Sequence, residues 1–475
     1  MSEIVARAPL RPLAWSDALL DLFDHIAALD VPAYVVGGAV RDAWLSRPVK
    51  DLDIATPESG TRLARQLANA LGGAYYALDS ERDTGRAIIE LDGEKLVIDV
   101  ARFRGENLLA DLLDRDFTIN AMAVDLRGDP TQIIDPVGGE RDAAAHVLRR
   151  CHDSALRQDP VRALRAVRQS VQLGFQLDRE TAADVRITAP LLAQVSPERA
   201  RDELFRLMAL SKAAAALKVA DALGVLPVVL PETIALRSAG AWGQTLDAIE
   251  RLSEMIVTFG PTRTDQTAAK FSLGMLVMGL DRFRPALRAH TLATWADDRA
   301  HQALLILALL LSAADPALAA ERARRLPLSN RELERLLLLL SSRDAYDLLG
   351  SDRAPLTLHR YWRRLGDAGI DLCFLSLARY LARTGVTIDQ DDWIRQVERA
   401  RALLEAYFDH HAQIVEPPVL VDGNALMQSL ALKPGPRVGQ LLDAIREAQV
   451  QGHVTSREAA LEFARALLRD LEEQQ

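Results

Sequence analysis

Cysteine is nearly absent from this chain, which contains Cys151 and Cys373 and no other cysteine. Two cysteines cannot build a disulfide framework, and their positions offer no zinc-binding pattern. This usage is typical of a reducing compartment, so we expect a cytoplasmic protein. The first 30 residues lack a signal-peptide pattern, and the longest apolar run, near 304–314, is too short to span a bilayer. We therefore expect no membrane partner.

Aromatic residues and net positive charge are also scarce. Aromatic residues make up 5% of the 475 residues, and the formal net charge is −9. The low aromatic content argues against recognition of unpaired RNA by base stacking. The negative balance means that any nucleic-acid surface must be a local basic patch. The length is consistent with three or four domains of about 100–200 residues each.

The secondary-structure signals change along the chain. Apolar spacing predicts helices over 15–30 and 61–71, and strand-like runs lie between and after them. The predicted strands are 33–37, 50–55, 74–79, 86–91 and 95–103. After Leu148 the pattern is helical almost to the end, with a linker at Pro417-Pro418. We therefore predict an α+β protein, with a small mixed-sheet domain ending near residue 150 and an all-helical remainder.

The strongest chemical signal is Gly37-Gly38-Ala39-Val40-Arg41-Asp42, followed by Asp51-Leu52-Asp53. Two carboxylates one residue apart point to the same side of a strand, where they can share divalent metal ions. A glycine pair lets the backbone approach a phosphate closely. Most isolated Asp-x-Asp pairs are solvated turn residues, but here apolar strand residues flank both motifs. The combination predicts two-metal transfer of a nucleotidyl group.

A third carboxylate, Asp99, ends another apolar segment. One interpretation is catalytic: Asp99 takes the proton from an attacking hydroxyl or helps to hold the second metal. The alternative is a strand-end salt bridge to Arg102 or Arg104. The residues alone leave both interpretations open.

Asp114-Arg115-Asp116 stands directly before an apolar segment that we expect to be buried. Arg115 would hold a triphosphate, and Asp116 would accept a hydrogen bond from a ribose 2′-hydroxyl. The alternative is a structural ion pair at a domain hinge, because a partly buried pair must be well matched to repay its desolvation.

A second cluster begins at Gln158-Asp159-Pro160 and continues with Arg162, Arg165 and Arg168. The arginines recur every three residues and so form a stripe along one side of a predicted helix. Taken alone, Asp159 is most simply a helix N-cap, and the arginines a solvated face.

Together these motifs resemble the class II branch of the polymerase-β-like nucleotidyltransferases, which includes bacterial tRNA CCA-adding enzymes and their poly(A) polymerase relatives. The matching motifs are, in chain order, Gly37-Gly38-Ala39-Val40-Arg41-Asp42, Asp51 with Asp53, Arg115-Asp116-Phe117-Thr118-Ile119-Asn120-Ala121, Asp135-Pro136-Val137-Gly138-Gly139, Asp159 with Arg162, and Ser196-Pro197-Glu198-Arg199 through Glu203. The end of the chain is similar to the C-terminal domain of the CCA-adding branch.

The resemblance implies four parts after a leader and first helix at 1–30: a nucleotidyltransferase head (31–150), a neck (151–230), a body (231–415) and a tail (416–475). It implies CTP and ATP as substrates and two Mg²⁺ ions as cofactors. The body and tail would bind the acceptor and TΨC arm of tRNA.

The resemblance also implies roles for single residues. The metal ligands would be Asp51 and Asp53, with the triphosphate held by Gly37, Gly38, Arg41, Lys50 and Arg115. The base readers would be Asp159 and Arg162, which match the Watson–Crick edge of C or A and reject U and G. Charge on Arg165 and Arg168 would hold the nucleotide or the primer.

Three departures from the family pattern bear on specificity. Gln158 replaces a usual Glu, and Asp114 replaces a usual Arg. Only the short segment Gly105–Ala110 stands where full CCA-adding members carry a long flexible loop that switches the pocket from C to A. CC-adding members, which leave the final A to a separate A-adding enzyme, lack that loop. The resemblance thus implies template-independent addition of C and possibly A to the 3′ end of tRNA, and a CC-adding specialist is the alternative.

Two further alternatives are a poly(A) polymerase and a non-catalytic RNA-binding relative. The acidic C-terminal residues disfavour the first, and the intact Asp51 and Asp53 disfavour the second. Many relatives carry a His-Asp metal phosphohydrolase in the body, but His290 and His301 have no His-Asp neighbour here. We interpret them as isolated packing or surface residues and predict no second hydrolase activity.

Overall fold

The computed structural model describes residues 5–260, 271–312, 315–385 and 387–473. The chain divides into two compact units. One comprises Met1–Glu203 with Val219–Val229, and the other comprises Leu204–Lys218 with Leu230–Gln475. The first unit thus holds most of the predicted head and neck, and the second holds the body and tail. The four-part boundaries themselves stay a prediction.

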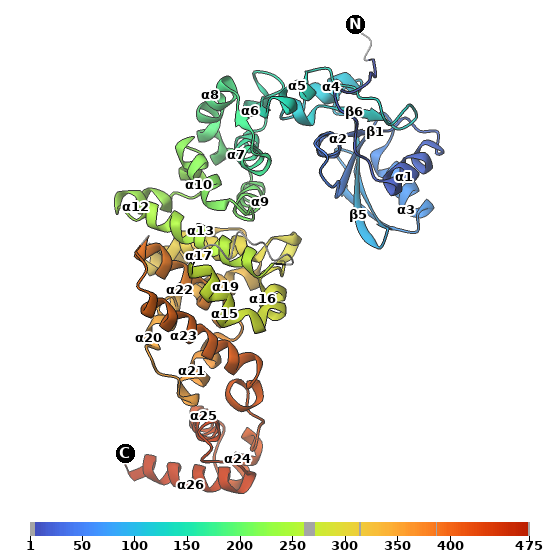
Figure 1. The fold of residues 1–475 in the computed structure, drawn as a ribbon. Coiled ribbons are helices and arrows are strands. Elements are labelled where there is room, and N and C mark those ends of the chain that lie inside the picture. The colour runs from blue at the N-terminus through green and yellow to red at the C-terminus, as the bar shows by residue number, and fades with distance from the viewer. Residues whose placement is uncertain (1–4, 261–270, 313–314, 386, 474–475) are drawn as a thin grey trace. The chain divides into compact units, whose positions relative to one another are not determined.

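The first unit is built on a six-stranded mixed sheet with the order β3-β4-β5-β2-β1-β6. Figure 1 labels β1, β5 and β6 of this sheet. The strands are β1 (Tyr34–Val36), β2 (Asp51–Thr56), β3 (Ala74–Asp79), β4 (Thr84–Leu91), β5 (Glu94–Arg102) and β6 (Ala123–Asp125). Only the β2–β5 pair within this sheet is parallel. The five predicted strands are confirmed to within two residues at each end. The short strand β6 was not predicted.

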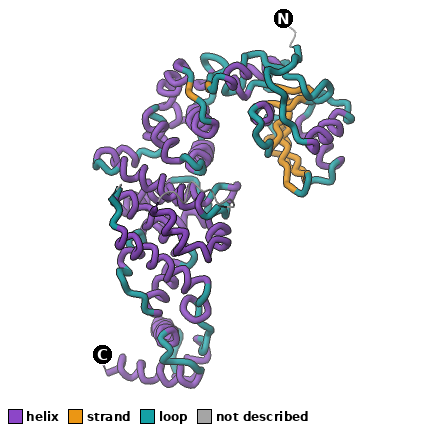
Figure 2. The backbone as a smooth tube through the Cα atoms, in the orientation of Figure 1, coloured by secondary structure: helices purple, strands orange, loops and turns teal. Residues whose placement is uncertain are grey.

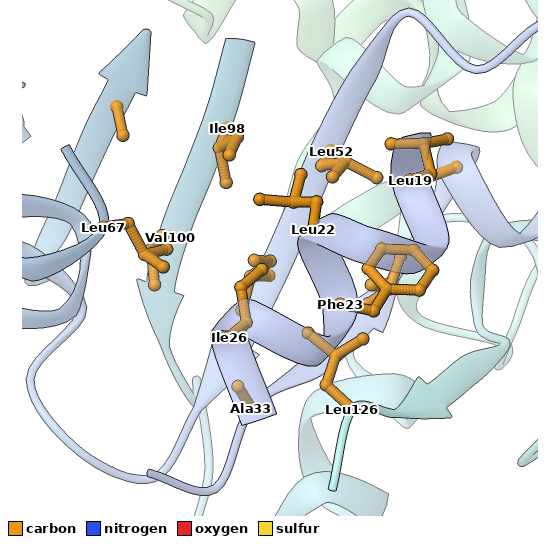
Figure 3. Packing of buried hydrophobic residues seen from close by; sticks show 14 of the residues in the cluster. Leu19, Leu22, Phe23, Ile26, Ala33, Leu52, Leu67, Ile98, Val100 and Leu126 are labelled. Carbon is orange, nitrogen blue, oxygen red and sulfur yellow. The ribbon is translucent and has the colours of Figure 1, made fainter. Parts of the chain in front are cut away.

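Helices α1 (Asp17–Ala27) and α3 (Gly60–Ala70) pack on one face of this sheet. Each begins after a serine whose hydroxyl accepts a backbone N–H of the first turn, so both starts are locally encoded. Their apolar sides meet the inward residues of β2 and β5 (Figure 3). Because strand side chains alternate, burying Leu52 and Ile54 turns Asp51 and Asp53 toward the other face.

The rest of the first unit is mostly helical (Figure 2). The helices of the sheet region are α2 (Gly38–Trp44), α4 (Leu108–Leu113) and α5 (Gly139–Ala144), with a 3₁₀ turn at Thr118–Asn120. The later helices are α6 (Ala155–Gln158), α7 (Val161–Leu173), α8 (Arg179–Thr188) and α9 (Pro197–Met208), of which residues 197–203 belong to this unit. One difference from an all-helical neck is a two-residue parallel pair, β7 (Val147–Leu148) with β8 (Gln176–Leu177).

Helices make up the described part of the second unit, and the α+β prediction is confirmed. They are α10 (Ala213–Ala222), α12 (Glu232–Ser238), α13 (Trp242–Thr258), α15 (Phe271–Leu280), α16 (Arg284–Thr291), α17 (His301–Ser312), α18 (Pro316–Arg325), α19 (Asn330–Ser341), α20 (Ala345–Leu348), α21 (Pro355–Leu365), α22 (Ala368–Thr384), α23 (Gln390–Phe408), α24 (Gly423–Leu430), α25 (Pro436–Val450) and α26 (Arg457–Glu473). The last three share an apolar cluster of their own. Helix α11 (Leu226–Val229) belongs to the first unit.

Residues 304–312 of the longest apolar run lie in α17, where residues 301–311 are all buried, and residues 313–314 lie outside the described residues. Its hydrophobicity therefore serves a protein core. Within the described segments, no helix combines the length and apolar character that crossing a membrane requires.

One prediction about the body is wrong. His290 and His301 are not isolated, because the Nε2 atom of each lies 2.7 Å from Oδ1 of Asp371. The contact joins α16, α17 and α22, and the spacing of the two histidines along the chain gave no sign of it.

Candidate active site

The turn between β1 and α2 brings the first site residues together. Gly37 has φ 76° and ψ −133°, a backbone conformation that L-residues with a side chain rarely adopt. A Cβ atom at this position would lie 2.9 Å from Nη1 of Arg115 and 3.4 Å from Oδ2 of Asp53. Glycine is therefore required here for both conformation and space. The turn, the Arg115 guanidinium and the Asp53 carboxylate lie against one another.

Three carboxylates share one face of the sheet beside this turn. Asp53 on β2 pairs in register with Asp99 on parallel strand β5, and Asp51 lies two residues earlier on β2. Solvent reaches the Asp53 side chain, but the surrounding protein removes part of its hydration and thereby raises its pKa. Arg115 opposes this rise, whereas the charges of Asp99 and Asp51 add to it. The cluster thus carries an excess of negative charge.

This carboxylate cluster fits a hard divalent cation. Mg²⁺ prefers oxygen ligands, and Asp51 and Asp53 offer them on adjacent outward positions of one strand. Burial raises the pKa of Asp53, so a cation bound beside it would stabilise its ionised form. Lys50 is exposed directly before β2, next to these ligands.

Asp99 is held by a partner that was not predicted. Arg86 on β4 donates from Nε and Nη2 to the two oxygens of Asp99, at 2.7 and 2.9 Å. The predicted alternative of a salt bridge to Arg102 or Arg104 is wrong, and Arg104 instead lies 3.5 Å from Asp114. A signal for the true pair exists in the sequence, since Asp92-Gly93 is a typical two-residue hairpin turn. A hairpin closed there pairs residue 91 with 94 and therefore Arg86 with Asp99.

One nitrogen of the Arg115 guanidinium is hydrogen-bonded, and another has no partner among the described residues. Its Nη2 donates to Oδ2 of the buried Asp111 at 3.0 Å, one helical turn earlier. Its Nε atom is buried without a hydrogen-bond partner among the described residues. A buried guanidinium nitrogen in this state is costly unless an anion accepts from it. The four-residue spacing from Asp111 to Arg115 was a readable signal for this anchor.

Asp116 connects the sheet region to α7. Its Oδ1 accepts from the Phe117 backbone N–H and from Nδ2 of Asn120, each at 2.9 Å, and Oδ2 lies 3.3 Å from Nη1 of Arg165. Burial alone would raise the pKa of Asp116, but Arg165 and the Asn120 amide outweigh burial and lower it. Asp116 is thus in an ion pair, but with Arg165, a partner that was not predicted, and the contact with a ribose hydroxyl stays a prediction.

Asn120, which was not predicted, links this ion pair to the glycine turn. Nη1 of Arg41 donates to Asn120 Oδ1 at 2.6 Å, while Nε and Nη2 bind Asp42. Asn120 also donates to Gln169 on α7 at 3.0 Å. A Cβ atom on Gly38 would lie 3.3 Å from Nη2 of Arg41, so this arginine packs over the start of α2.

The neck residues have firm partners as well. Asp159 is not the N-cap of α7, because Pro160 takes that place, and its carboxylate instead accepts from Nη2 of Arg199 at 2.7 Å. The proline fixes the backbone at the helix start and leaves the preceding side chain free to turn toward α9. Arg162 is buried and donates to the backbone oxygens of Asp114 and Ala155, at 2.6 and 3.1 Å.

The two later arginines converge on one carboxylate. Arg165 and Arg168 lie 3.3 and 2.9 Å from the oxygens of Glu203 on α9. The interpretation of the arginine stripe as a solvated face is therefore wrong. Their predicted roles toward nucleotide or primer remain predictions.

Known proteins similar to this chain are polymerase and nucleotidyltransferase enzymes that act on RNA. Residues 33–149 match the family model described as the Poly A polymerase head domain, and residues 388–464 match a model of tRNA nucleotidyltransferase domain 2. Residues 174–236 match a model for an RNA- and SrmB-binding site of polymerase A. The chain is 33% identical to a CC-adding tRNA nucleotidyltransferase of Geobacter sulfurreducens, covering 91% of both chains. It is 32% identical to an A-adding tRNA nucleotidyltransferase of Deinococcus radiodurans, covering 91% of this chain and 94% of that one.

Solved structures show the same fold. A CCA-adding enzyme in complex with ATP aligns with a TM-score of 0.62 at 20% identity, covering 96% of this chain and 97% of that one. The Thermotoga maritima CCA-adding enzyme in complex with tRNA aligns with a TM-score of 0.56 at 22% identity, covering 96% and 97%.

Proposed function

This chain belongs to the tRNA nucleotidyltransferase family, and on that premise we propose that it adds C from CTP to the 3′ end of tRNA without a nucleic-acid template. The observation that carries the proposal is the cluster of Gly37, Asp53 and Arg115 beside Asp51. It combines oxygen ligands for a metal with a guanidinium whose Nε lacks an acceptor among the described residues.

In the proposed reaction, the terminal hydroxyl of tRNA attacks the α-phosphate of the nucleotide, and pyrophosphate leaves. Two Mg²⁺ ions held by Asp51 and Asp53 would activate that hydroxyl and stabilise the charge on the leaving oxygens. Arg115, whose Nη1 lies beside the Gly37 turn, would bind the triphosphate. Gly37 leaves room for the phosphates to approach the backbone, and Arg41 and Lys50 add positive charge. Asp99, held by Arg86, supplies negative charge beside Asp53 and is a weaker candidate for proton transfer.

Base selection is proposed for Asp159 and Arg162. A carboxylate accepts from the exocyclic amine of C or A, and a guanidinium donates to the adjacent ring acceptor. U and G present the opposite pattern at those edges. Arg199 already binds one oxygen of Asp159 at 2.7 Å, so the other oxygen is the one available to a base.

For the RNA substrate, we propose that the body and tail bind the acceptor and TΨC arm by shape and phosphate contacts. The aligned Thermotoga structure is titled as a complex with tRNA, which supports this assignment. Structures of aligned CCA-adding enzymes with ATP and with CTP support both as ligand types.

We propose that addition stops after the second C. Strand β5 ends at Arg102 and α4 begins at Leu108, capped by Asn107, so the connection is too short to hold the long switching loop of full CCA-adding members. Addition of A is the second candidate, because an A-adding relative matches 91% of the chain at 32% identity.

The test uses purified protein, labelled CTP, ATP, UTP or GTP, and tRNA lacking its 3′ CCA or ending in CC. Two C residues on the first tRNA and none on the second support the CC-adding proposal. A single A added to tRNA-CC supports the second candidate, and a long A tail supports a poly(A) polymerase. Binding of tRNA without any product refutes catalysis.

A further inference from the structure

Two imidazoles and a carboxylate converge in the body, within the second compact unit. His290 lies in the last turn of α16, His301 begins α17, and Asp371 lies in the first turn of α22. One nitrogen of each ring and one oxygen of Asp371 all lie within 4.8 Å of one another. Asp371 is fully buried, His301 is almost fully buried, and the side chain of His290 is 14% exposed.

The two imidazoles converge on one oxygen of Asp371, although they come from different helices. Both Nε2 atoms approach the same oxygen, Oδ1, at 2.7 Å each, while the other carboxylate oxygen, Oδ2, accepts from Nη1 of Arg335 at 2.9 Å. The two rings are 5.0 Å apart at 74°, so they meet Oδ1 from different directions. Three potential ligand atoms therefore lie close together, and His290 is the most exposed of the three residues.

From this geometry we propose that the body binds one transition-metal dication of the Zn²⁺ type through His290 Nε2, His301 Nε2 and Asp371 Oδ1. Two imidazoles and one carboxylate form a donor set that suits such ions, whereas Mg²⁺ prefers oxygen ligands alone. With the metal bound, the proton of each neutral ring resides on Nδ1, and water completes the fourth position.

The distances allow this with small movements. Ligand atoms about 2.0–2.1 Å from a tetrahedral metal are about 3.3 Å apart, so the two Nε2–Oδ1 distances would each open by about 0.6 Å. The partly exposed His290 can move outward. His301 is fixed by stacking on Trp295, with ring centroids 5.3 Å apart.

The residues around Asp371 orient its carboxylate and set the net charge of the proposed site. Arg335 holds Oδ2 of Asp371 and also binds Oδ1 of Asp367 at 2.6 Å, which orients the ligand as outer partners do in metal sites. With neutral imidazoles, two carboxylates and one guanidinium leave one net negative charge for a dication to compensate. Since the ligands come from three helices, the metal would clamp α16, α17 and α22 together. This proposal does not depend on the nucleotidyltransferase activity.

The experiment uses the full chain, freed of metal by chelation and titrated with Zn²⁺ in excess Mg²⁺. Elemental analysis after gel filtration counts bound zinc. His290→Gln removes a ligand at the most exposed position, and His453→Gln, at an exposed tail histidine, is the matched control. Asp53→Asn measures any zinc held at the head carboxylates.

We expect one Zn²⁺ per chain in wild type, His453→Gln and Asp53→Asn. For His290→Gln we expect affinity lower by more than about 100-fold, because loss of an outer partner alone costs about 10–100-fold. Equal zinc binding by His290→Gln and wild type would overturn the proposed metal site. So would the loss of all bound zinc in Asp53→Asn, because the zinc would then belong to the head carboxylates. In either case the three residues form a hydrogen-bonded cluster only. If His290→Gln does not fold, Co²⁺ bound to wild type decides the question. Intense visible bands of a tetrahedral site support the proposal, and weak octahedral bands refute it.

Discussion

Replacing Gly37 by alanine is the sharpest test of the proposed active site. Two separate effects are expected from the structure. The backbone at φ 76° and ψ −133° disfavours any L-residue with a side chain, which costs about 1–3 kcal/mol. The new Cβ would also lie 2.9 Å from Nη1 of Arg115 and 3.4 Å from Oδ2 of Asp53. The guanidinium must give way, although Asp111 anchors its other nitrogen.

The expected loss of activity follows from that displacement. Moving a positioning group by about 1 Å can cost about 100-fold in rate. We therefore expect kcat/KM for CTP to fall by about 100-fold, with a raised KM because Arg115 is assigned to the triphosphate. The melting temperature falls by about 2–4 °C for each kcal/mol lost in a unit of this size.

Gly174→Ala is the matched control. Gly174 follows α7 with φ 74°, almost the same value, but a Cβ atom there would meet nothing within 4 Å. Its left-handed backbone predicts a stability loss of about 1–2 kcal/mol with kcat/KM unchanged. Initial rates of CTP incorporation and thermal unfolding of both variants measure the comparison. Equal kcat/KM in Gly37→Ala and Gly174→Ala would refute the assignment of the Gly37 turn to the active site.

Three further outcomes are expected. Asp53→Asn abolishes nucleotide addition while tRNA binding persists. In the presence of a chelator, this substitution also raises the melting temperature at neutral pH. The reason is that the raised pKa of the Asp53 carboxyl stabilises the protein below the unfolded-state pKa, and this stabilisation is lost as the pH rises through the folded-state pKa. The increase in melting temperature must therefore shrink as the pH is lowered. Arg86→Gln frees Asp99 from its partner. If Asp99 needs that positioning, kcat is expected to fall by about 10-fold with KM for CTP unchanged. An unchanged kcat would contradict a positioning role for Arg86. Arg199→Gln releases Asp159 and is expected to increase misincorporation of UTP relative to CTP, measured by single-nucleotide competition; unchanged discrimination would show that Arg199 does not position the base reader.

The parts of the site that sequence could predict are those set by local rules. Alternation along β2 places Asp51 and Asp53 on one face because Leu52 and Ile54 enter the core. The Asp92-Gly93 turn fixes the β4–β5 register and so pairs Arg86 with Asp99, although that signal was overlooked. Asp159 shows the limit of such rules, since its expected capping role is displaced by Pro160 and its partner Arg199 follows 40 residues later.

Contacts between distant helices could not be predicted in this way. His290 and His301 reach Asp371 across 81 and 70 residues, and helical periodicity says which face is buried but not which helix it meets. The same holds for Glu203, which gathers Arg165 and Arg168 onto α9.

A polar network around Asn120 connects the residues proposed for phosphate binding to the helix proposed for base reading. Arg41 beside the glycine turn binds Asn120, Asn120 binds Asp116, and Asp116 pairs with Arg165 on α7. Each group is buried or half-buried, so removing one leaves its neighbour unsatisfied, at a cost of about 1–3 kcal/mol. The residues assigned to the triphosphate are thereby tied to the helix that carries Arg162. On these proposed roles, a nucleotide that binds both ends would strengthen one connected structure, which would favour selection by the whole nucleotide over selection by the base alone.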